Sequence, residues 1–178
     1  MNSASRIKKK RQLPTAISVA VLFTSILLIA ACGKGPGAKD GPLIGTFPMG
    51  ERVQVGHLIY TVMEAKWQTQ LSDDPKSRPP KNRYLVVKMN ITNSGPDQTV
   101  IPPMVLINNS GVNSAEVSEG VDDEPRWFGG LLRSLKTMQT DPGVVIFDVP
   151  MSAYKLKVTD GEMENEKYAL IDIPVHIE

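Results

Sequence analysis

Residues 83–93, RYLVVKMNITN, form the most strand-like stretch of the chain. Successive side chains of a strand point to opposite faces, and the odd positions from Leu85 to Ile91 are all apolar. This alternation predicts a strand with one face in the core. The residues that follow predict a turn, because Asn93 and Gly95 tolerate the left-handed backbone conformation.

Similar stretches lie on both sides of this segment. Residues 57–67, HLIYTVMEAKW, place Leu58, Tyr60 and Val62 on one face, and Trp67 at the end is interpreted as a core or rim anchor. Further strands are predicted at 52–55, 99–101, 105–108, 143–149 (ended by Pro150), 154–159 and 168–177. Only residues 125–135 have room for a helical turn or two. Short strands without βαβ alternation predict an all-β antiparallel sandwich, although their spacing alone also fits a barrel.

The amino terminus has the pattern of a bacterial export signal. Five basic residues between Arg6 and Arg11 precede an almost wholly apolar run, 15–31, which stops at Cys32. The sequence Ile29-Ala30-Ala31-Cys32 resembles the lipobox of bacterial lipoproteins. That resemblance implies cleavage before Cys32 and attachment of a diacylglycerol to its thiol. Two acyl chains satisfy the requirement for stable membrane anchoring.

Two other interpretations of this segment stay open: an uncleaved membrane anchor, and an ordinary secretory signal with an incidental cysteine. The apolar run is shorter than the roughly 20 residues that a spanning helix needs. We therefore predict a signal peptide over 1–31, a lipidated Cys32 with a Gly/Pro-rich tether over 32–50, and one β-sandwich domain over 51–178. The expected location is extracytoplasmic, on the bacterial cell membrane or the outer membrane.

The charge of the mature chain argues against nucleic acid as a partner. Five of the 20 basic residues lie in the predicted signal, which leaves 15 against 19 acidic residues and a net charge of −4. Binding to phosphates requires a basic face, which this composition does not favour. Cys32 is the only cysteine, so lipidation leaves no thiol for a disulfide.

No motif predicts an enzyme or a resident cofactor. The two histidines, His57 and His176, lack the spacing of a zinc site. Eight methionines suggest copper, but Met63 and Met89 have the simpler interpretation of filling gaps in the core. The loop carboxylates suggest calcium but lack the spacing of a known loop, so solvated acidic turns explain them more simply; they are Asp73-Asp74 and Asp122-Asp123-Glu124.

One segment has the composition of a binding site. Arg126, Trp127 and Phe128, followed by Gly129 and Gly130, combine the residue types that dominate interface hot spots. The alternative is that these aromatic side chains plug one end of the sandwich. We expect a non-enzymatic module that binds an envelope protein or polymer, and an extracytoplasmic carrier of a small ligand, copper or calcium is the alternative function.

Three stretches taken in order resemble a known family: VQVGHLIYTVMEAKW from Val53, PPKNRYLVVKMNITNSGPDQ from Pro79, and PGVVIFDVP with YKLKV from Pro142. They look like a family of bacterial immunoglobulin-like lipoprotein domains of unknown function, similar to secreted antigens of mycobacteria. The resemblance implies an immunoglobulin-like sandwich and no catalytic residue, and it leaves residues 121–138 and the strand after Glu166 unmatched. Some members are labelled telomeric repeat-binding factors, which an acidic domain behind an export signal contradicts.

Overall fold

Strand β4 (Arg83–Asn93) lies in the middle of a four-stranded antiparallel sheet, paired with β3 on one side and β9 on the other. The computed structural model describes residues 42–72, 78–117 and 133–175, all of which belong to one compact unit, 39–178. This sheet has the order β2 (Val53–Val55), β3 (Leu58–Gln68), β4 and β9 (Thr140–Val149).

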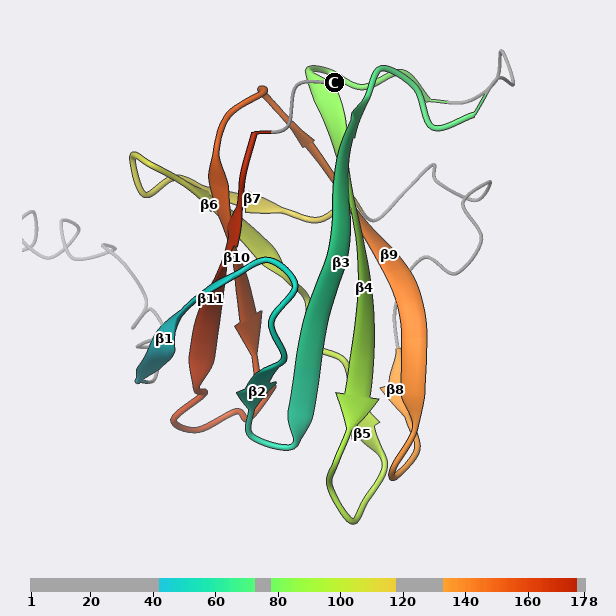
Figure 1. The fold of residues 1–178 in the computed structure, drawn as a ribbon, viewed down its shortest axis with the longest axis vertical. Helices are drawn as coiled ribbons and strands as arrows, with labels where there is room; N and C mark the ends of the chain where they lie inside the picture. The colour runs from blue at the N-terminus through green and yellow to red at the C-terminus, as the bar shows by residue number, and fades with distance from the viewer. Residues whose placement is uncertain (1–41, 73–77, 118–132, 176–178) are drawn as a thin grey trace, which may run out of the picture. The chain divides into compact units, whose positions relative to one another are not determined.

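A five-stranded sheet forms the second layer (Figure 1). Its order is β1 (Leu43–Pro48), β11 (Tyr168–Ile173), β10 (Tyr154–Thr159), β6 (Val105–Asn108) and β7 (Asn113–Ala115). Every pairing in it is antiparallel except that of β1 with β11. A short ladder joins β5 (Thr99–Val100) to β8 (Ser134–Leu135). The predicted all-β sandwich is confirmed.

The core lies between the inner faces of the two sheets. The alternate apolar residues of β4 that the sequence placed on one face, from Leu85 to Ile91, are all buried there. Tyr60 of β3 is fully buried and its hydroxyl donates a 2.7 Å hydrogen bond to the Thr159 carbonyl of β10, which joins the sheets. Burial raises the pKa of the Tyr60 hydroxyl well above its ordinary value. The phenol therefore stays a donor at every physiological pH.

Strand β3 contains a β-bulge at Met63, where the pairing shifts between Val62–Met89 and Glu64–Lys88. The extra residue reverses the alternation, so that Ala65 and Trp67 face the core after it. Trp67 packs against the core with its ring centroid 6.2 Å from that of Tyr154, which agrees with the predicted anchor. Met89 is buried as expected, but the expectation for Met63 is wrong, because the bulge leaves it 60% exposed.

The turn after β4 is organised by the side chain of Asn93, which is fully buried. Its amide nitrogen donates to the carbonyl oxygens of Asp97 (2.7 Å) and Leu135 (3.2 Å), and its oxygen accepts from the Gly95 amide (2.9 Å). Asn93 therefore holds the turn and also ties it to β8. The sequence predicted the first role of this residue but not the second.

The structure corrects several predicted boundaries. Strand β1 lies within 32–50, the range predicted as tether, because Phe47 packs on the core while β11 supplies a backbone partner. The last strand ends at Ile173, before Pro174, rather than at Ile177. Within 125–135, the described residues Ser134 and Leu135 form strand β8 and no helix. Strand β7 was not predicted.

Candidate functional site

The candidate binding residues Arg126, Trp127 and Phe128 and the predicted lipidation site, Cys32, lie outside the described residues. So do His176 and the carboxylates considered for calcium, Asp73-Asp74 and Asp122-Asp123-Glu124. The structure does describe both flanks of residues 118–132, which carry the Arg-Trp-Phe sequence. These flanks form the described part of the candidate site.

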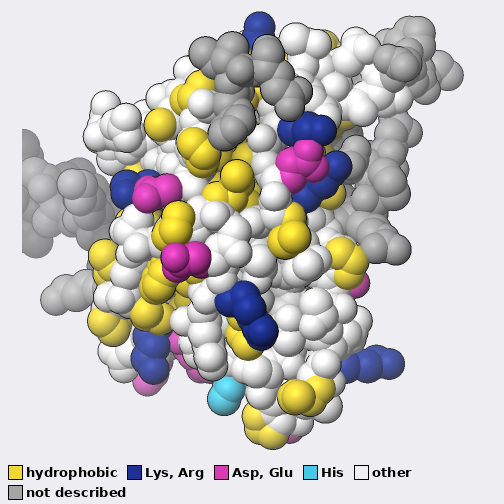
Figure 2. All heavy atoms as spheres, in the orientation of Figure 1, with side chains coloured by type: hydrophobic (Ala, Val, Ile, Leu, Met, Phe, Trp, Pro, Cys, Tyr) yellow, Lys and Arg dark blue, Asp and Glu magenta, His cyan; other side chains and the backbone are white. Residues whose placement is uncertain are grey.

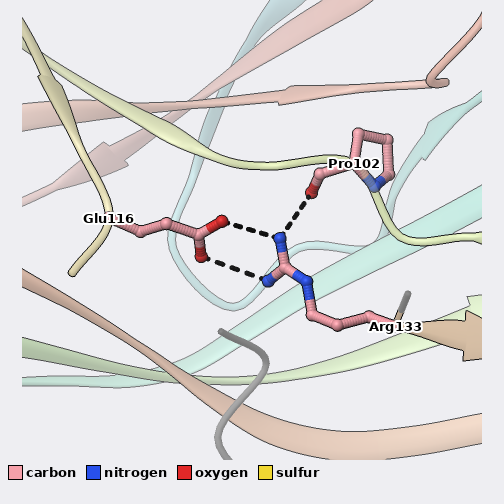
Figure 3. Close-up of polar contacts among 3 residues, drawn as sticks. All are labelled: Pro102, Glu116 and Arg133. Atoms are coloured by element: carbon pink, nitrogen blue, oxygen red, sulfur yellow. Dashed lines mark hydrogen bonds and ion pairs between the residues drawn. The ribbon is translucent and has the colours of Figure 1, made fainter. Parts of the chain in front are cut away.

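An ion pair between Glu116 and Arg133 joins the two flanks (Figure 3). The guanidinium binds the carboxylate with both terminal nitrogens, Nη1 to Oε2 at 3.1 Å and Nη2 to Oε1 at 2.7 Å. Nη2 also donates to the carbonyl oxygen of Pro102 at 3.2 Å. This fork-to-fork geometry is among the strongest side-chain interactions in proteins, because both partners are charged and both bonds are aligned.

The pair is largely removed from solvent, with 10% of the Arg133 side chain and 11% of the Glu116 side chain exposed. Burial raises the pKa of the Glu116 carboxyl above its ordinary value, and the charge and hydrogen bonds of Arg133 oppose that shift. Such a pair contributes little net stability, but losing one partner is costly because the other charge is left buried. The contact therefore holds the flanks in one fixed arrangement.

Backbone hydrogen bonds fix the same flanks to the sandwich. The Val117 amide donates to the Ile146 carbonyl of β9, and the Ile101 amide donates to the Arg133 carbonyl, both at 2.7 Å. Val117 and Arg133, the described residues on either side of the segment, are therefore both tied to the sandwich. Val117 is bonded to β9, and Arg133 is bonded to Ile101, the residue after β5. A scaffold that fixes both ends of a loop in this way is a common arrangement for binding residues.

The flank at Val117 also closes an apolar cluster on the outer face of the four-stranded sheet. Tyr84 and Val86 of β4 and Val144 and Ile146 of β9 are buried there together with Val117. The Tyr84 hydroxyl donates to the Arg78 carbonyl at 2.8 Å. Strand β4 thus has apolar neighbours on both faces, which explains why residues 83–87 lack a clean alternation.

An open hollow of about 360 Å³ lies near this cluster, lined by Met63, Lys88, Met89, Asn90, Pro142, Gly143 and Val144. Its lining residues come from β3, β4 and β9. Glu64 binds the Lys88 ammonium at 3.0 Å and that of Lys66 at 2.7 Å, and these bonds lower the pKa of the carboxyl. The lysine at the hollow is therefore already paired with a carboxylate.

The described residues supply few groups for metal chemistry. No group of three or more His, Cys, Asp or Glu side chains within 42–72, 78–117 and 133–175 is placed to hold a metal ion. His57 lies in the exposed turn between β2 and β3. In the same ranges no helix is long and apolar enough to cross a membrane.

Sequence reasoning missed Glu116 and Arg133. They are 17 positions apart, neither lies in a predicted strand, and a lone charge in a loop is usually solvated. Apart from the proximity of Arg133 to the Arg-Trp-Phe sequence, nothing in the pattern marks them. Pairing across a loop of this length depends on where the strands carry its ends, which only the folded structure gives.

Known structures share the fold at low sequence identity. The yjhA protein of Bacillus subtilis is 16% identical and matches with a TM-score of 0.54 over 71% of this chain and 99% of its own. A proposed lipoprotein of the same organism, ycdA, is 15% identical with a TM-score of 0.54 over 70% of this chain and 38% of its own. The secreted protein MPT63 of Mycobacterium tuberculosis is 13% identical with a TM-score of 0.50, over 72% and 96%. These likenesses establish the sandwich fold.

The family comparison agrees with the resemblance found in the sequence. None of the curated proteins matches this chain. The model of one family, described as a domain of unknown function (DUF4352), matches residues 47–169 and so includes strands β2 to β10. Because this match covers more than half of the chain, the chain belongs to the DUF4352 family.

Proposed function

We propose that this chain is a lipoprotein anchored to a bacterial envelope membrane, and that its sandwich is a non-enzymatic module binding an envelope protein or polymer. The observation that carries the binding part is the Glu116–Arg133 pair, which fixes both flanks of the segment containing Arg126, Trp127 and Phe128. These three residues contact the partner. The two aromatic side chains offer a large apolar area and the arginine offers a planar cation, and tryptophan and arginine are among the residues enriched in binding hot spots.

The anchoring part rests on the amino-terminal sequence and on two of the similar structures. Cys32 follows a basic and then apolar segment with small residues at the cleavage boundary. One similar structure is a proposed lipoprotein and another is a secreted protein, so both support an extracytoplasmic location. Lipid on Cys32 brings the sandwich to the membrane surface facing away from the cytoplasm.

Replacing Cys32 with serine should release the chain from membranes. Serine keeps the size of the side chain but removes the sulfur that accepts the diacylglycerol, so metabolic labelling with an alkyne fatty acid should fall to background. Centrifugation of cell envelopes should then find the variant in the soluble fraction or as an uncleaved precursor. Labelling that persists in this variant would rule out Cys32 as the lipidation site.

Replacing Trp127 and Phe128 with alanine should abolish capture of the partner. The measurement is a crosslinking pull-down from intact envelopes with the lipidated full chain, analysed by mass spectrometry. Truncating two hot-spot aromatics costs at least about 2 kcal/mol of binding, or roughly thirtyfold in affinity. A species captured by the wild type should therefore disappear from the variant.

A matched control separates binding from folding. Met163 is fully exposed in the turn between β10 and β11, so Met163→Ala changes an exposed apolar side chain without touching the proposed site. This control should capture the partner as the wild type does, and circular dichroism should show that all three proteins are folded. If the double variant unfolds, Trp127 and Phe128 belong to the core and the proposed site is wrong.

A further inference from the structure

Four turns of the sandwich meet at one end of the domain. Gly56, in the turn between β2 and β3, lies so close to Asp160 that a Cβ on it would come within 2.7 Å of the aspartate Cβ. The Ser94 amide donates to the His57 carbonyl at 2.8 Å, and the Asn93 amide donates to the Gln139 carbonyl at 2.9 Å. These contacts join the turns β2–β3, β4–β5, β8–β9 and β10–β11.

Strand β1 begins at the same end, because Leu43 is paired with Tyr168 and Tyr168 with Thr159. Five large apolar side chains are exposed there: Leu43 and Ile44 at 46% each, Val100 at 51%, Met138 at 77% and Met163 at 100%. Met163 is set apart from the other four, because it lies between Glu162 and Glu164. We call Leu43, Ile44, Val100 and Met138 the tether-end set. Figure 2 shows hydrophobic side chains at the lower end of the view and along its left edge, the side on which Figure 1 places β1.

Met138 is locally unfavourable in two ways. Its backbone has a φ of 56°, a left-handed conformation that is unfavourable for an ordinary side chain and favours Gly or Asn. The chain uses asparagine for the same conformation at Asn165, where φ is 59°. A residue that is both strained and an exposed hydrophobe points to a contact outside the domain, since strain of this kind tends to persist where it serves a function.

We propose that the tether-end set rests on the lipid surface to which the chain is anchored. This inference depends on the proposed lipidation of Cys32. Leu43 lies eleven residues after Cys32, and a chain of that length spans at most about 40 Å. The start of β1 therefore cannot lie farther than this from the lipidated residue. At such a tether length the local concentration of membrane is high, so a few half-exposed aliphatic side chains are enough to dock.

The charges at this end favour an apolar contact over an electrostatic one. The turn between β10 and β11 contains Glu162, Glu164 and Glu166, of which the first two are exposed, and one exposed lysine, Lys167. Lys136 is exposed in the turn between β8 and β9, so carboxylates outnumber ammonium groups in these two turns. These carboxylates repel an anionic surface, and the repulsion is screened by salt. Docking should therefore persist or strengthen as salt is added, whereas a contact made by lysines would weaken.

The test uses the lipidated full chain in phosphatidylcholine vesicles that contain a spin-labelled lipid. Because Cys32 is the only cysteine and lipidation consumes it, a cysteine introduced by Ile44→Cys or Met138→Cys takes a polarity-sensitive fluorophore at one position. We expect blue-shifted emission and quenching by the spin-labelled lipid at both positions. The matched control is Val112→Cys, because Val112 is 57% exposed in the turn at the opposite end, and it should remain unquenched.

A second set of variants tests the side chains themselves with the fluorophore at position 138 or 44. Leu43→Thr and Ile44→Thr keep the preference for a strand, and Met138→Asn suits the left-handed backbone. Each should reduce the ratio of docked to free domain by roughly fivefold, since each withdraws about half of an aliphatic side chain from the lipid. Val112→Thr should leave the ratio unchanged.

The possible failures are distinguishable. If the protein does not float with the vesicles, lipidation of Cys32 fails. If the protein floats but the fluorophores at 44 and 138 are as little quenched as the one at 112, lipidation is supported and the proposed contact of the tether-end set with lipid is wrong. If burial at 44 and 138 appears only at high protein density, a second copy of the chain covers the set and the lipid contact is wrong.

Discussion

Replacing Arg133 with methionine should lower the free energy of unfolding by about 3 kcal/mol at neutral pH, the low end of the cost of breaking a buried ion pair. Methionine retains the aliphatic part of the side chain, but the Glu116 carboxylate loses both of its charged hydrogen bonds. The Pro102 carbonyl loses a donor as well. Urea denaturation followed by tryptophan fluorescence gives the change.

The loss of stability in Arg133→Met should become smaller as the pH is lowered. Burial raises the pKa of Glu116 in the folded state above its value in the unfolded state. This difference stabilises the folded state fully at a pH below the unfolded-state pKa. The stabilisation is lost as the pH rises through the folded-state pKa. Removing the guanidinium raises the folded pKa further. The difference in the free energy of unfolding between the wild type and Arg133→Met should therefore decrease as the pH is lowered from 7 to about 4.

A double-mutant cycle isolates the pair from the rest of the loop flank. Glu116→Leu alone leaves a buried guanidinium and should also destabilise, whereas Arg133→Met with Glu116→Leu should recover most of the loss, because an apolar pair fills the site without an unpaired charge. If the destabilisations of the two single variants add up in the double variant, Glu116 and Arg133 have no interaction energy. The flanks would then be held by their backbone hydrogen bonds alone.

Replacing Asn93 with alanine should cost about 3 kcal/mol, because it leaves several buried polar groups without partners at once. The Gly95 amide loses its acceptor, and the carbonyls of Asp97 and Leu135 lose their donor. The turn between β4 and β5 and its contact with β8 depend on the same side chain. Thermal unfolding monitored by circular dichroism should show a clear fall in Tm.

Two further variants sharpen this result. Asn93→Asp retains the acceptor for Gly95 but replaces both donors with a buried charge, so it should destabilise at least as much as alanine at neutral pH. Asn90→Ala changes a half-buried asparagine on the same strand and should have a small effect. Equal losses for Asn90→Ala and Asn93→Ala would mean that the buried amide has no special role.

The sequence predicted the strands that bury one face and turn at recognisable residues. Strand β4 and the turn at Asn93 are examples, because alternation and turn chemistry are local properties. Strand β1 was missed because Gly45 and Pro48 weaken its pattern and its partner β11 is far along the chain. The exposure of Met63 was missed because a bulge depends on register with the neighbouring strand.

The site was predictable to a lesser degree. The composition around Trp127 indicates a binding segment, but the Glu116–Arg133 pair that holds its flanks depends on where distant strands place two charges. The tether-end set likewise depends on segments that are distant in the sequence, since its members come from β1, β5 and the turn between β8 and β9. Exposure at the end of a sandwich is a property of the assembled turns, and no local pattern encodes it.

The parallel pairing of β1 with β11 joins the first and the last strand of the domain. A polypeptide is made from its amino terminus, so β1 emerges long before the strand that it pairs with. Contacts between such distant segments form late, after most of the chain is available. The five-stranded sheet can therefore be completed only after β11 has been made. Until β11 is available, β1 has no backbone partner, and its N–H and C=O groups can pair with any other extended segment that they meet.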